Sequence, residues 1–503
     1  MGLATLLERS ALQRGDQVFA TFPGGKLTFR DLFEKAGRIA MHVARQGIRP
    51  GDRVALMVDN GPEAVALVFG LAIARVIWVP VNVNLRGHGL GYLLTHSEPS
   101  LILLDEKYRA AVQALERGGI APVMDARGFV HEANASGGDA DLPGSAELDD
   151  PFAIMYTSGT TGAPKGVIVT HRMFVCCGEG VTHVTVPQPG DVFYIWEPLF
   201  HIGGAQLLTV PFFREVRLHI TERFSATRFW DEVRACEATH IHYLGGILDI
   251  LLKAPPSPKE REHNVRIAWG AGCRAEVWRE IENRFGLAVR ECYGMTEASS
   301  ITAYNADGTV GNVGREVPWL EVRLAGWDAA AADGRGEILV RGREPGIISP
   351  GYFNNDDATR AALRDGWLYT GDVGSFDAEG RLRFHGRTGD SLRVRGENIS
   401  AWELEHVVSS HPEVAECAAI GVAAEIGEQE IKLFVRPVAD TAPRPQDLVR
   451  WLDGKVASYQ MPRFIAFVSD FDRTPSQRIM KHRLPTSTEG CWDRLAEGLE
   501  GRG

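Results

Sequence analysis

The chain has 503 residues, of which 44% are hydrophobic and 24% charged, and it carries a net charge of −11. At ~150 residues per domain, this length predicts about three structural units around more than one core. The composition is that of an ordinary globular protein. The negative charge, without a dense cluster of Lys and Arg, argues against a nucleic-acid-binding protein.

The first part of the chain alternates helix-like and strand-like segments. An apolar period of about 3.6 predicts a helix through residues 27–43, followed by a strand over Arg53–Val58. Another helix is expected over Pro62–Ala74 and another strand over Val76–Val81. The apolar stretch in the second helix is well short of the ~20 residues that span a bilayer, so no membrane span is expected. This alternation is typical of parallel α/β layers.

Changes of composition divide the rest of the chain. Stretches rich in Gly, Ala, Asp or Pro, at 134–150 and 253–264, predict exposed loops. Beyond Arg335, short alternating segments broken by Gly and Asp predict antiparallel hairpins. From Asn398 onward, a helix followed by a strand predicts a smaller α+β unit that closes the chain.

A glycine-rich loop lies in "YTSGTTGAPKGV" (Tyr156–Val167), between the strand-like segments "FAIMYT" and "GVIVTH". Glycines allow close backbone approach, and amide and hydroxyl donors turned inward suit a polyphosphate. The loop is not a Walker A motif, because Lys165 is followed by Gly166 instead of Ser or Thr. A flexible solvent-exposed loop is the alternative, which the strand flanks and four hydroxyl side chains disfavour. These hydroxyls belong to Thr157, Ser158, Thr160 and Thr161.

Four more sequence strings follow this loop in order. They are "YGMTE" (Tyr293–Glu297), "YTGDVG" (Tyr369–Gly374), "GRTGDSLRVRGENISAWELE" (Gly386–Glu405) and "RTPSQRIMK" (Arg473–Lys481). With the loop, they cover essentially the whole chain, which resembles the adenylate-forming superfamily of acyl-CoA synthetases, beetle luciferases and peptide-synthetase adenylation domains. The similarity is greatest to AMP-forming acyl-CoA ligases of the carnitine-CoA-ligase-like branch.

The resemblance implies an α/β fold with two domains. Residues 1–388 would form a large N-terminal domain of layered α/β subdomains with a small β-barrel portion, which binds ATP and the acyl group. Residues 389–503 would form a small, mobile C-terminal α+β lid. Its hinge would be Gly389, where the family normally has Asp or Lys; glycine permits the backbone change without a Cβ penalty.

The activity that the resemblance implies is the ATP- and Mg²⁺-dependent conversion of a hydrophobic carboxylic acid to its CoA thioester. The acid would attack the α-phosphorus of ATP, release pyrophosphate and become acyl-AMP, from which a thiol displaces AMP. Positioning and charge neutralisation would carry the first step. The enzyme alternatives are the adenylation half-reaction only, or transfer to a carrier-protein thiol. An alternative of another class is a catalytically weakened nucleotide-binding regulatory protein.

The expected partners are a small-molecule carboxylic acid, ATP and CoA, without nucleic acid. A homodimer, and a partner enzyme or carrier protein, stay open as further partners. The seven cysteines show neither a CxxC pair nor metal-ligand spacing, and no secretory leader precedes them. This predicts reduced thiols and a cytoplasmic location.

The resemblance assigns the nucleotide-binding side chains. Tyr293 would pack against adenine, Asp372 would accept hydrogen bonds from the ribose hydroxyls, and Glu297 would bind Mg²⁺. Thr296 would contact the α-phosphate, and Arg387 the ribose or a phosphate. Taken singly, these residues have structural alternatives, such as core packing, a helix N-terminal charge or a turn. The full set is Thr157, Ser158, Gly159, Thr160, Thr161, Gly162, Lys165, Gly270, Ala271, Gly272, Tyr293, Gly294, Thr296, Asp372 and Arg387.

The string "EPLFHIGG" (Glu197–Gly204) matches the acyl-CoA synthetase form of the next motif. It lacks the Phe-Asp pair of amino-acid-adenylating domains, which disfavours an amino acid substrate. His201 would border the acyl pocket, with a core or gating role without proton chemistry as an equal alternative. The aromatic candidates have core packing as their alternative. The pocket candidates are Trp196, Phe200, His201, Ile202, Tyr243, Leu244, Ala271 and Met295.

Two positions in the small domain depart from the family pattern. The first is the hinge residue, Gly389. The other is Gln477-Arg478 in place of Gly-Lys, whose lysine bridges the substrate carboxylate and the α-phosphate. Arg478 keeps the charge as a planar fork instead of a point ammonium, and Lys481 is the alternative cation. The resemblance places Gly396 and Glu397 at the CoA tunnel. The full catalytic set is Lys165, Thr296, Glu297, Arg387, Arg478 and Lys481.

Overall fold

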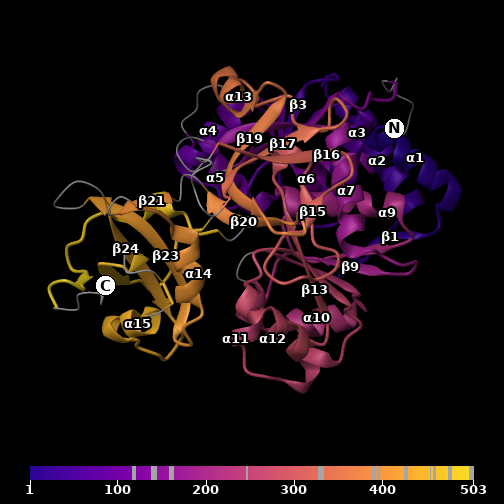
Figure 1. Ribbon diagram of the computed structural model, residues 1–503. Coiled ribbons are helices and arrows are strands. Elements are labelled where there is room, and N and C mark those ends of the chain that lie inside the picture. Colours follow the sequence, from indigo (N-terminus) through magenta and orange to yellow (C-terminus); the bar gives the residue numbers. More distant parts are fainter. Residues whose placement is uncertain are drawn as a thin grey trace.

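The computed structural model describes residues 1–115, 121–136, 144–157, 164–244, 247–326, 334–387, 391–394, 397–423, 429–453, 455–456, 460–473 and 478–497. Figure 1 shows a large body, which holds the N-terminus, and a smaller C-terminal unit beside it. Within the described residues, three sheets belong to the large body and two to the smaller unit. No helix in these ranges is both long and apolar enough to cross a membrane.

The first sheet has six strands in the order β6-β5-β3-β4-β7-β8, all parallel except the last pair. They are β3 (Arg53–Met57), β4 (Ile77–Pro80), β5 (Leu101–Leu104), β6 (Val123–Asp125), β7 (Pro151–Thr157) and β8 (Lys165–Thr170). Helix α2 (Phe29–Arg45) begins at a capping box, in which the side chains of Thr28 and Asp31 each bind the other's backbone N–H. The predicted alternation of helices and strands is confirmed, with ends shifted by one or two residues.

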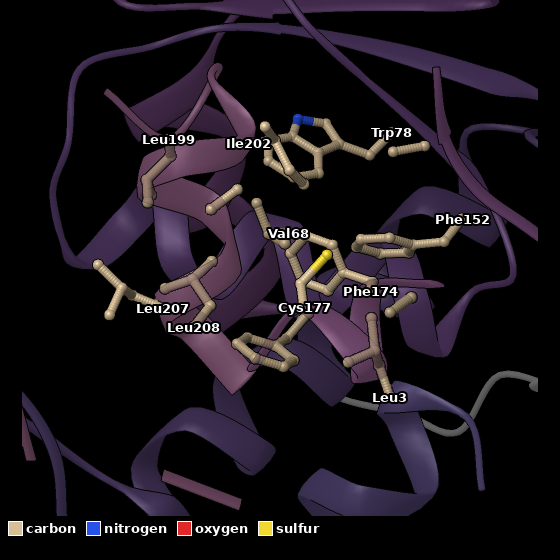
Figure 2. Close-up of a cluster of buried hydrophobic side chains, with 14 of the residues drawn as sticks. Leu3, Val68, Trp78, Phe152, Phe174, Cys177, Leu199, Ile202, Leu207 and Leu208 are labelled. Carbon is tan, nitrogen blue, oxygen red and sulfur yellow. The ribbon is translucent and has the colours of Figure 1, made fainter. Parts of the chain in front are cut away.

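The second sheet has nine strands in the order β15-β14-β13-β12-β11-β9-β10-β1-β2, parallel from β13 to β1. They are β1 (Val18–Phe22), β2 (Gly25–Thr28), β9 (Val192–Ile195), β10 (Arg217–Ile220), β11 (His240–Leu244), β12 (Ile267–Ala271), β13 (Ala288–Tyr293), β14 (Ala303–Tyr304) and β15 (Arg315–Glu316). Helix α7 (His171–Thr185) contacts strands of both sheets, so it lies between them. Figure 2 shows the hydrophobic core at this level, where Phe174 of α7 lies near Trp78 and Phe152 of the first sheet.

Shorter helices cover the faces of these sheets. They are α1 (Leu3–Arg14), α3 (Pro62–Ile73), α4 (Gly87–Ser97), α5 (Arg109–Gln113), α6 (Ala126–Ala135), α8 (Ile202–Ala205), α9 (Val210–Phe213), α10 (Phe229–Ala235), α11 (Ile247–Lys253), α12 (Ala275–Phe285) and α13 (Asp356–Ala362). Single 3₁₀ turns are η1 (Glu106–Tyr108), η2 (Gln206–Thr209), η3 (Pro258–Arg261) and η4 (Thr296–Ala298).

The structure differs between the two segments that were predicted to be exposed loops, 134–150 and 253–264. Of the stretch 134–150, residues 144–150 are outside helices and strands, while 137–143 lie outside the described residues. The stretch 253–264 is more ordered than expected, because it contains η3, where Glu260 is buried and accepts a hydrogen bond from Arg284 Nε at 2.9 Å. This ion pair anchors the connector to α12.

The third sheet is antiparallel and has five strands, as the Gly- and Asp-rich hairpin pattern predicted. They are β16 (Leu320–Ala325), β17 (Gly336–Gly342), β18 (Leu363–Arg364), β19 (Trp367–Phe376) and β20 (Leu382–Arg387). A small β-barrel portion was expected within residues 1–388, and this antiparallel sheet lies in that range. Its last two strands deliver residues to the site described below.

The C-terminal unit has its own hydrophobic core. Its four-stranded sheet has the order β23-β24-β25-β26, beside the hairpin β21-β22. The strands are β21 (Ser391–Val394), β22 (Glu397–Ser400), β23 (Val414–Ala423), β24 (Gln429–Pro437), β25 (Phe464–Phe467) and β26 (Trp492–Asp493), with helices α14 (Ala401–Ser409), α15 (Pro445–Leu452) and the 3₁₀ turn η7 (Lys481–Arg483). The predicted helix and strand after Asn398 are α14 and β23.

Several contacts join the C-terminal unit, called the lid from here on, to the large body. Helix α14 packs near β20, as Figure 1 shows. His406 Nε2 of α14 lies 2.8 Å from Glu276 Oε2 at the start of α12. Lys253 Nζ, at the end of α11, donates a hydrogen bond to the backbone carbonyl of Ala415 at 3.1 Å. The lid therefore lies against β20 of the third sheet and against helices α11 and α12.

Candidate active site

A carboxylate, a phenol and a guanidinium from three strands meet at one end of the site. Asp372 of β19 accepts a hydrogen bond from the Tyr293 hydroxyl of β13 at 2.7 Å and from Arg387 Nε of β20 at 2.9 Å. Asp372 is buried, and its backbone N–H donates to the Thr370 hydroxyl. The Tyr293 ring stacks on Phe384, with ring centroids 5.7 Å apart. Three residues assigned to adenine and ribose thus come together.

Glu297, the predicted metal ligand, lies in η4 and is 7% exposed. Its Oε1 accepts a hydrogen bond from the Tyr352 hydroxyl at 2.8 Å. Lys165 Nζ lies 5.1 Å from the centroid of the Tyr352 ring, so Tyr352 connects the base of the glycine-rich loop to Glu297. Burial raises the pKa of the Glu297 carboxyl. A cation bound nearby would stabilise its charged form.

The segment 349–353, which carries Tyr352, is held along β8. The carbonyl of Gly166 accepts a hydrogen bond from this segment at 2.8 Å, and the N–H of Ile168 donates one to it at 3.0 Å. Further along, the Ser349 N–H donates to the backbone carbonyl of Glu297 at 2.8 Å. A single extended segment therefore ties η4 to β8.

Most of the glycine-rich loop lies outside the described residues, including the predicted phosphate contacts Ser158, Gly159, Thr160, Thr161 and Gly162. The strands on either side are described. Thr157 ends β7, Lys165 begins β8, and the two are opposite each other in the antiparallel pair. Lys165 therefore stands at the base of the loop.

A tight turn follows β13. A Cβ on Gly294 would lie 1.6 Å from the carbonyl oxygen of Ser300, so only glycine fits there. Ser299 and Ser300 have φ values of 55° and 66°, in the left-handed region that non-glycine residues seldom adopt. Thr296 is buried at the start of η4, which contacts β8. The turn thus folds the end of "YGMTE" back toward the glycine-rich loop.

The residues predicted to border the acyl group begin next to α8, with His201. The Nδ1 atom of His201 accepts a hydrogen bond from the Gly203 N–H at 3.0 Å, which leaves the proton of the neutral ring on Nε2. Burial, followed by the nearby side chains of Arg478 and His242, lowers the pKa of His201 to about 4. The ring is therefore neutral at pH 7. Of the two alternatives for His201, this favours the one without proton transfer.

The other acyl candidates divide by exposure. Trp196 and Tyr243 are buried in a hydrophobic cluster, where Trp196 Nε1 donates to the His242 carbonyl at 2.9 Å. Ile202 lies in the core cluster of Figure 2. All three are buried, and their place at the acyl pocket stays a prediction. Partly exposed residues are Phe200, Leu244, Ala271 and Met295.

A buried pair of a carboxyl and an imidazole lies next to α8. Glu197 Oε1 and His242 Nδ1 are in direct contact, with side chains 2% and 3% exposed. The His242 ring packs on Trp269 of β12, with ring centroids 4.1 Å apart. Asn60 braces the turn from the first sheet by donating to the Glu197 carbonyl at 2.8 Å and accepting from the Leu199 N–H at 2.9 Å. The backbone before His201 is thus fixed from two sheets.

Comparisons with known proteins identify the family of this chain. The AMP-binding enzyme family matches residues 7–353, and the AMP-binding enzyme C-terminal domain matches residues 403–478. The chain belongs to the AMP-binding enzyme family.

Named relatives of this AMP-binding enzyme span nearly its whole length. Sulfoacetate–CoA ligase of Cupriavidus necator is 31% identical over 96% of this chain and 97% of its own. Crotonobetaine/carnitine–CoA ligase of Salmonella paratyphi C is 28% identical over 91% of this chain and 93% of its own. The ATP-bound structure of MatB from Rhodopseudomonas palustris superimposes with a TM-score of 0.85, at 26% identity, over 96% of this chain and 98% of that one. The resemblance to adenylate-forming enzymes and the predicted fold class are confirmed.

The lid of the AMP-binding enzyme places its two candidate cations differently. Arg478 lies close enough to His201 for its charge to lower the pKa of the imidazole. Lys481 Nζ lies 2.9 Å from Glu405 Oε1, so it pairs within the lid. The predicted hinge, Gly389, and the tunnel residue Gly396 lie outside the described residues, while the backbone of Glu397 begins β22.

The residues present fit a magnesium ion. Glu297 is a buried carboxylate whose raised pKa signals that its charge needs a partner. Among the described residues, no group of three or more His, Cys, Asp or Glu side chains could hold a metal by itself. This donor set suits Mg²⁺, which commonly binds through one or two carboxylates together with substrate phosphates and water.

Sequence reasoning missed several residues of the site. Tyr352 connects Lys165 and Glu297, and its only signal was the Gly-Tyr pair in "SPGYFNN". The pair of Glu197 and His242 gave no local signal, because its members lie 45 residues apart.

Proposed function

We propose that this AMP-binding enzyme converts a hydrophobic carboxylic acid to its acyl-CoA thioester by way of acyl-AMP. The observation that carries the proposal is the hydrogen-bonded cluster of Tyr293, Asp372 and Arg387. Glu297 lies near enough for the charges of Arg387 and Asp372 to affect its pKa. Nucleotide and metal contacts would therefore share one site, as adenylation requires.

The nucleoside would bind at the Tyr293 ring and the Asp372 carboxylate. Each oxygen of Asp372 already accepts one hydrogen bond, and a carboxylate offers about four acceptor positions, which leaves acceptors for ribose hydroxyls. Lys165, at the base of the glycine-rich loop, would neutralise the phosphate tail. Thr296 would contact the α-phosphate from η4.

Glu297 would hold Mg²⁺ together with phosphate oxygens of ATP. The ion would supply neutralisation of the phosphate charges. Tyr352 orients the carboxylate through its 2.8 Å hydrogen bond.

In the first half-reaction, a carboxylate oxygen of the acid bonds to the α-phosphorus while the bond to pyrophosphate breaks. Arg478 would neutralise the two negative groups as they meet, which is the role of the family lysine. The Nε2–H of neutral His201 is a further donor on this side. In the second half-reaction, the sulfur of CoA bonds to the acyl carbon, and the bond to AMP breaks.

A hydrophobic acyl group is supported by the partly exposed residues of the acyl side. Phe200, Leu244, Ala271 and Met295 all have apolar side chains. The neutral state of His201 also avoids a buried positive charge beside an apolar group.

Mass spectrometry tests the proposal directly. Purified protein with MgATP and a pool of aliphatic, aromatic and polycyclic acids is incubated with and without CoA. Acyl-CoA that appears only with CoA is the expected result, and its mass identifies the acid. Acyl-AMP that accumulates despite CoA would favour adenylation only or a carrier-protein thiol. ATP binding without acid-dependent release of pyrophosphate would contradict the proposal and favour the regulatory alternative.

We also propose a cytoplasmic location, which is supported by the state of the cysteines. All seven cysteines are free thiols, four of them partly exposed, as expected for a reducing compartment. Cell fractionation with an antibody against the native protein checks this.

A further inference from the structure

A row of three residues crosses β11, β12 and β13 under the loop assigned to adenine. Tyr243 is the neighbour of Gly270, which is the neighbour of Glu291. Gly270 has no side chain, and a Cβ there would lie 1.8 Å from the carbonyl oxygen of Tyr243. The gap lets the two outer side chains meet across the middle strand, where the Tyr243 hydroxyl donates to Glu291 Oε2 at 2.6 Å.

Glu291 also holds the loop that follows β12. Its Oε1 accepts hydrogen bonds from the backbone N–H of Gly272 at 2.5 Å and of Cys273 at 3.3 Å. Glu291 is 7% exposed, and burial raises its pKa to about 7. Its described donors are one hydroxyl and two backbone N–H groups, so the carboxylate is held by neutral groups.

The position of Glu291 on its strand connects it to the ribose end. Glu291 and Tyr293 are two residues apart on β13, so their side chains leave the same face of the sheet. One carboxylate thus touches the loop assigned to adenine and the phenol at the acyl side, and it shares a strand face with the residue that binds Asp372.

We propose that Glu291 is a positioning residue. It fixes the loop at Gly272 relative to Tyr243 and thereby fixes where the nucleotide binds relative to the acyl group. The inference rests on the proposed function, since it concerns the same site. An ionised carboxylate accepts from all three donors at once, whereas an amide has one acceptor oxygen and an NH₂ that must donate. Replacing the carboxylate therefore disturbs the loop, the phenol or both.

Binding of AMP, measured by calorimetry, tests the nucleotide half without knowledge of the acid. Glu291→Gln is expected to weaken AMP binding about tenfold, since the amide has only one acceptor oxygen for the three donors that Glu291 holds. Tyr243→Phe removes only the phenol hydroxyl, so AMP affinity should stay within about twofold while the KM for the acid rises severalfold. Glu280→Gln, an exposed carboxylate on α12, is the matched control and should change neither quantity.

The outcomes separate the inference from the proposed function. Wild-type protein that binds neither AMP nor MgATP would contradict the proposed function itself. Wild-type binding that Glu291→Gln leaves unchanged would overturn the role of Glu291 alone. If Glu291→Gln does not fold, Tyr243→Phe decides: an unchanged KM for the acid overturns the inference. A purely structural role predicts a lower melting temperature for Tyr243→Phe with KM and kcat intact.

Discussion

The nucleotide side of the site consists of buried polar side chains that bind one another, whereas the acyl side consists of glycines, a neutral imidazole and partly exposed apolar groups. Asp372 has two side-chain donors and Glu297 one before any ligand arrives. On the acyl side, His201 is held by a backbone N–H. The nucleotide side is thus preorganised for one ligand, while the acyl side leaves its ligand open to variation in shape.

This difference explains why nucleotide binding can be inferred from relatives, whereas the identity of the acid cannot. Two relatives that cover nearly all of this chain are named for different acids, sulfoacetate and crotonobetaine or carnitine. A fixed polar network recognises the part of the reaction that is constant, and a cavity of apolar side chains recognises the part that changes. Variants on the two sides should therefore fail in different ways.

The largest effect is expected on the nucleotide side, from Lys165→Ala and Glu297→Gln. Each should lower adenylation by roughly 10²–10³-fold, as the loss of one preorganised charge does in other active sites. Burial raises the pKa of Glu297, so its charge costs folding free energy at pH 7, and the neutral Gln should not lower the melting temperature. Acid-dependent pyrophosphate release and thermal unfolding measure the two quantities.

Lys259→Ala is the matched control for Lys165→Ala, because Lys259 is an exposed lysine on η3. Activity equal to wild type in either nucleotide-side variant would remove that residue from the site.

A comparable loss is expected where the lid reaches the acyl side. Arg478→Ala should reduce adenylation by about 100-fold or more, while Arg478→Lys should retain or raise it, because the family uses lysine there. Lys481→Ala should affect mainly stability, since Lys481 pairs with Glu405 within the lid. Damage to adenylation from Lys481→Ala, with Arg478→Ala harmless, would show that the assignment is reversed.

A smaller and selective effect is expected from Leu244→Ala. Leu244 is partly exposed, and its Cδ1 lies 3.4 Å from where a Cβ on Gly203 would be. Removing it should shift kcat/KM toward bulkier acids by about tenfold and leave AMP affinity unchanged. Competition between two acids of different size in one reaction measures this. A parallel change in AMP affinity would break the distinction between the two sides.

The smallest effect is expected from His201 and pH. The pKa of His201 is lowered to about 4, so the ring stays neutral from pH 5.5 to 8 and contributes no inflection to kcat/KM there. Below about pH 6.5 this histidine binds a proton in the unfolded chain but not in the folded protein. The free energy of unfolding therefore decreases as the pH is lowered from about 6.5 to about 4. His201→Phe should keep the shape of the pH profile and lose only a few-fold in rate. An inflection near neutral pH that disappears in His201→Phe would reveal proton transfer.

The sequence was most informative where a motif and its partner lie close together in the chain. The two strands around the glycine-rich loop and the α/β alternation follow from local chemistry and were predicted. Contacts between distant strands were not. Glu291 reads as an ordinary strand residue until Gly270 opens the space beside it, and Tyr352 gains its role only because its segment pairs with β8.

The acyl side illustrates the second limit of the sequence. Trp196, Ile202 and Tyr243 were candidates for a largely apolar pocket. The structure buries all three. The period of a strand or helix does not tell which buried side chain also borders a ligand. Apolar character alone cannot distinguish a pocket wall from packing.

The segment 349–353 has a consequence for how this protein would lose activity. It joins β8 to η4 by a few backbone hydrogen bonds, and through Tyr352 it connects Lys165 of β8 to Glu297 of η4. The proposed active site therefore also lies where separate parts of the large body are joined. A slight slip between its sheets would separate Lys165 from Glu297 while each hydrophobic core stays intact, so under mild denaturant inactivation should precede the loss of secondary structure.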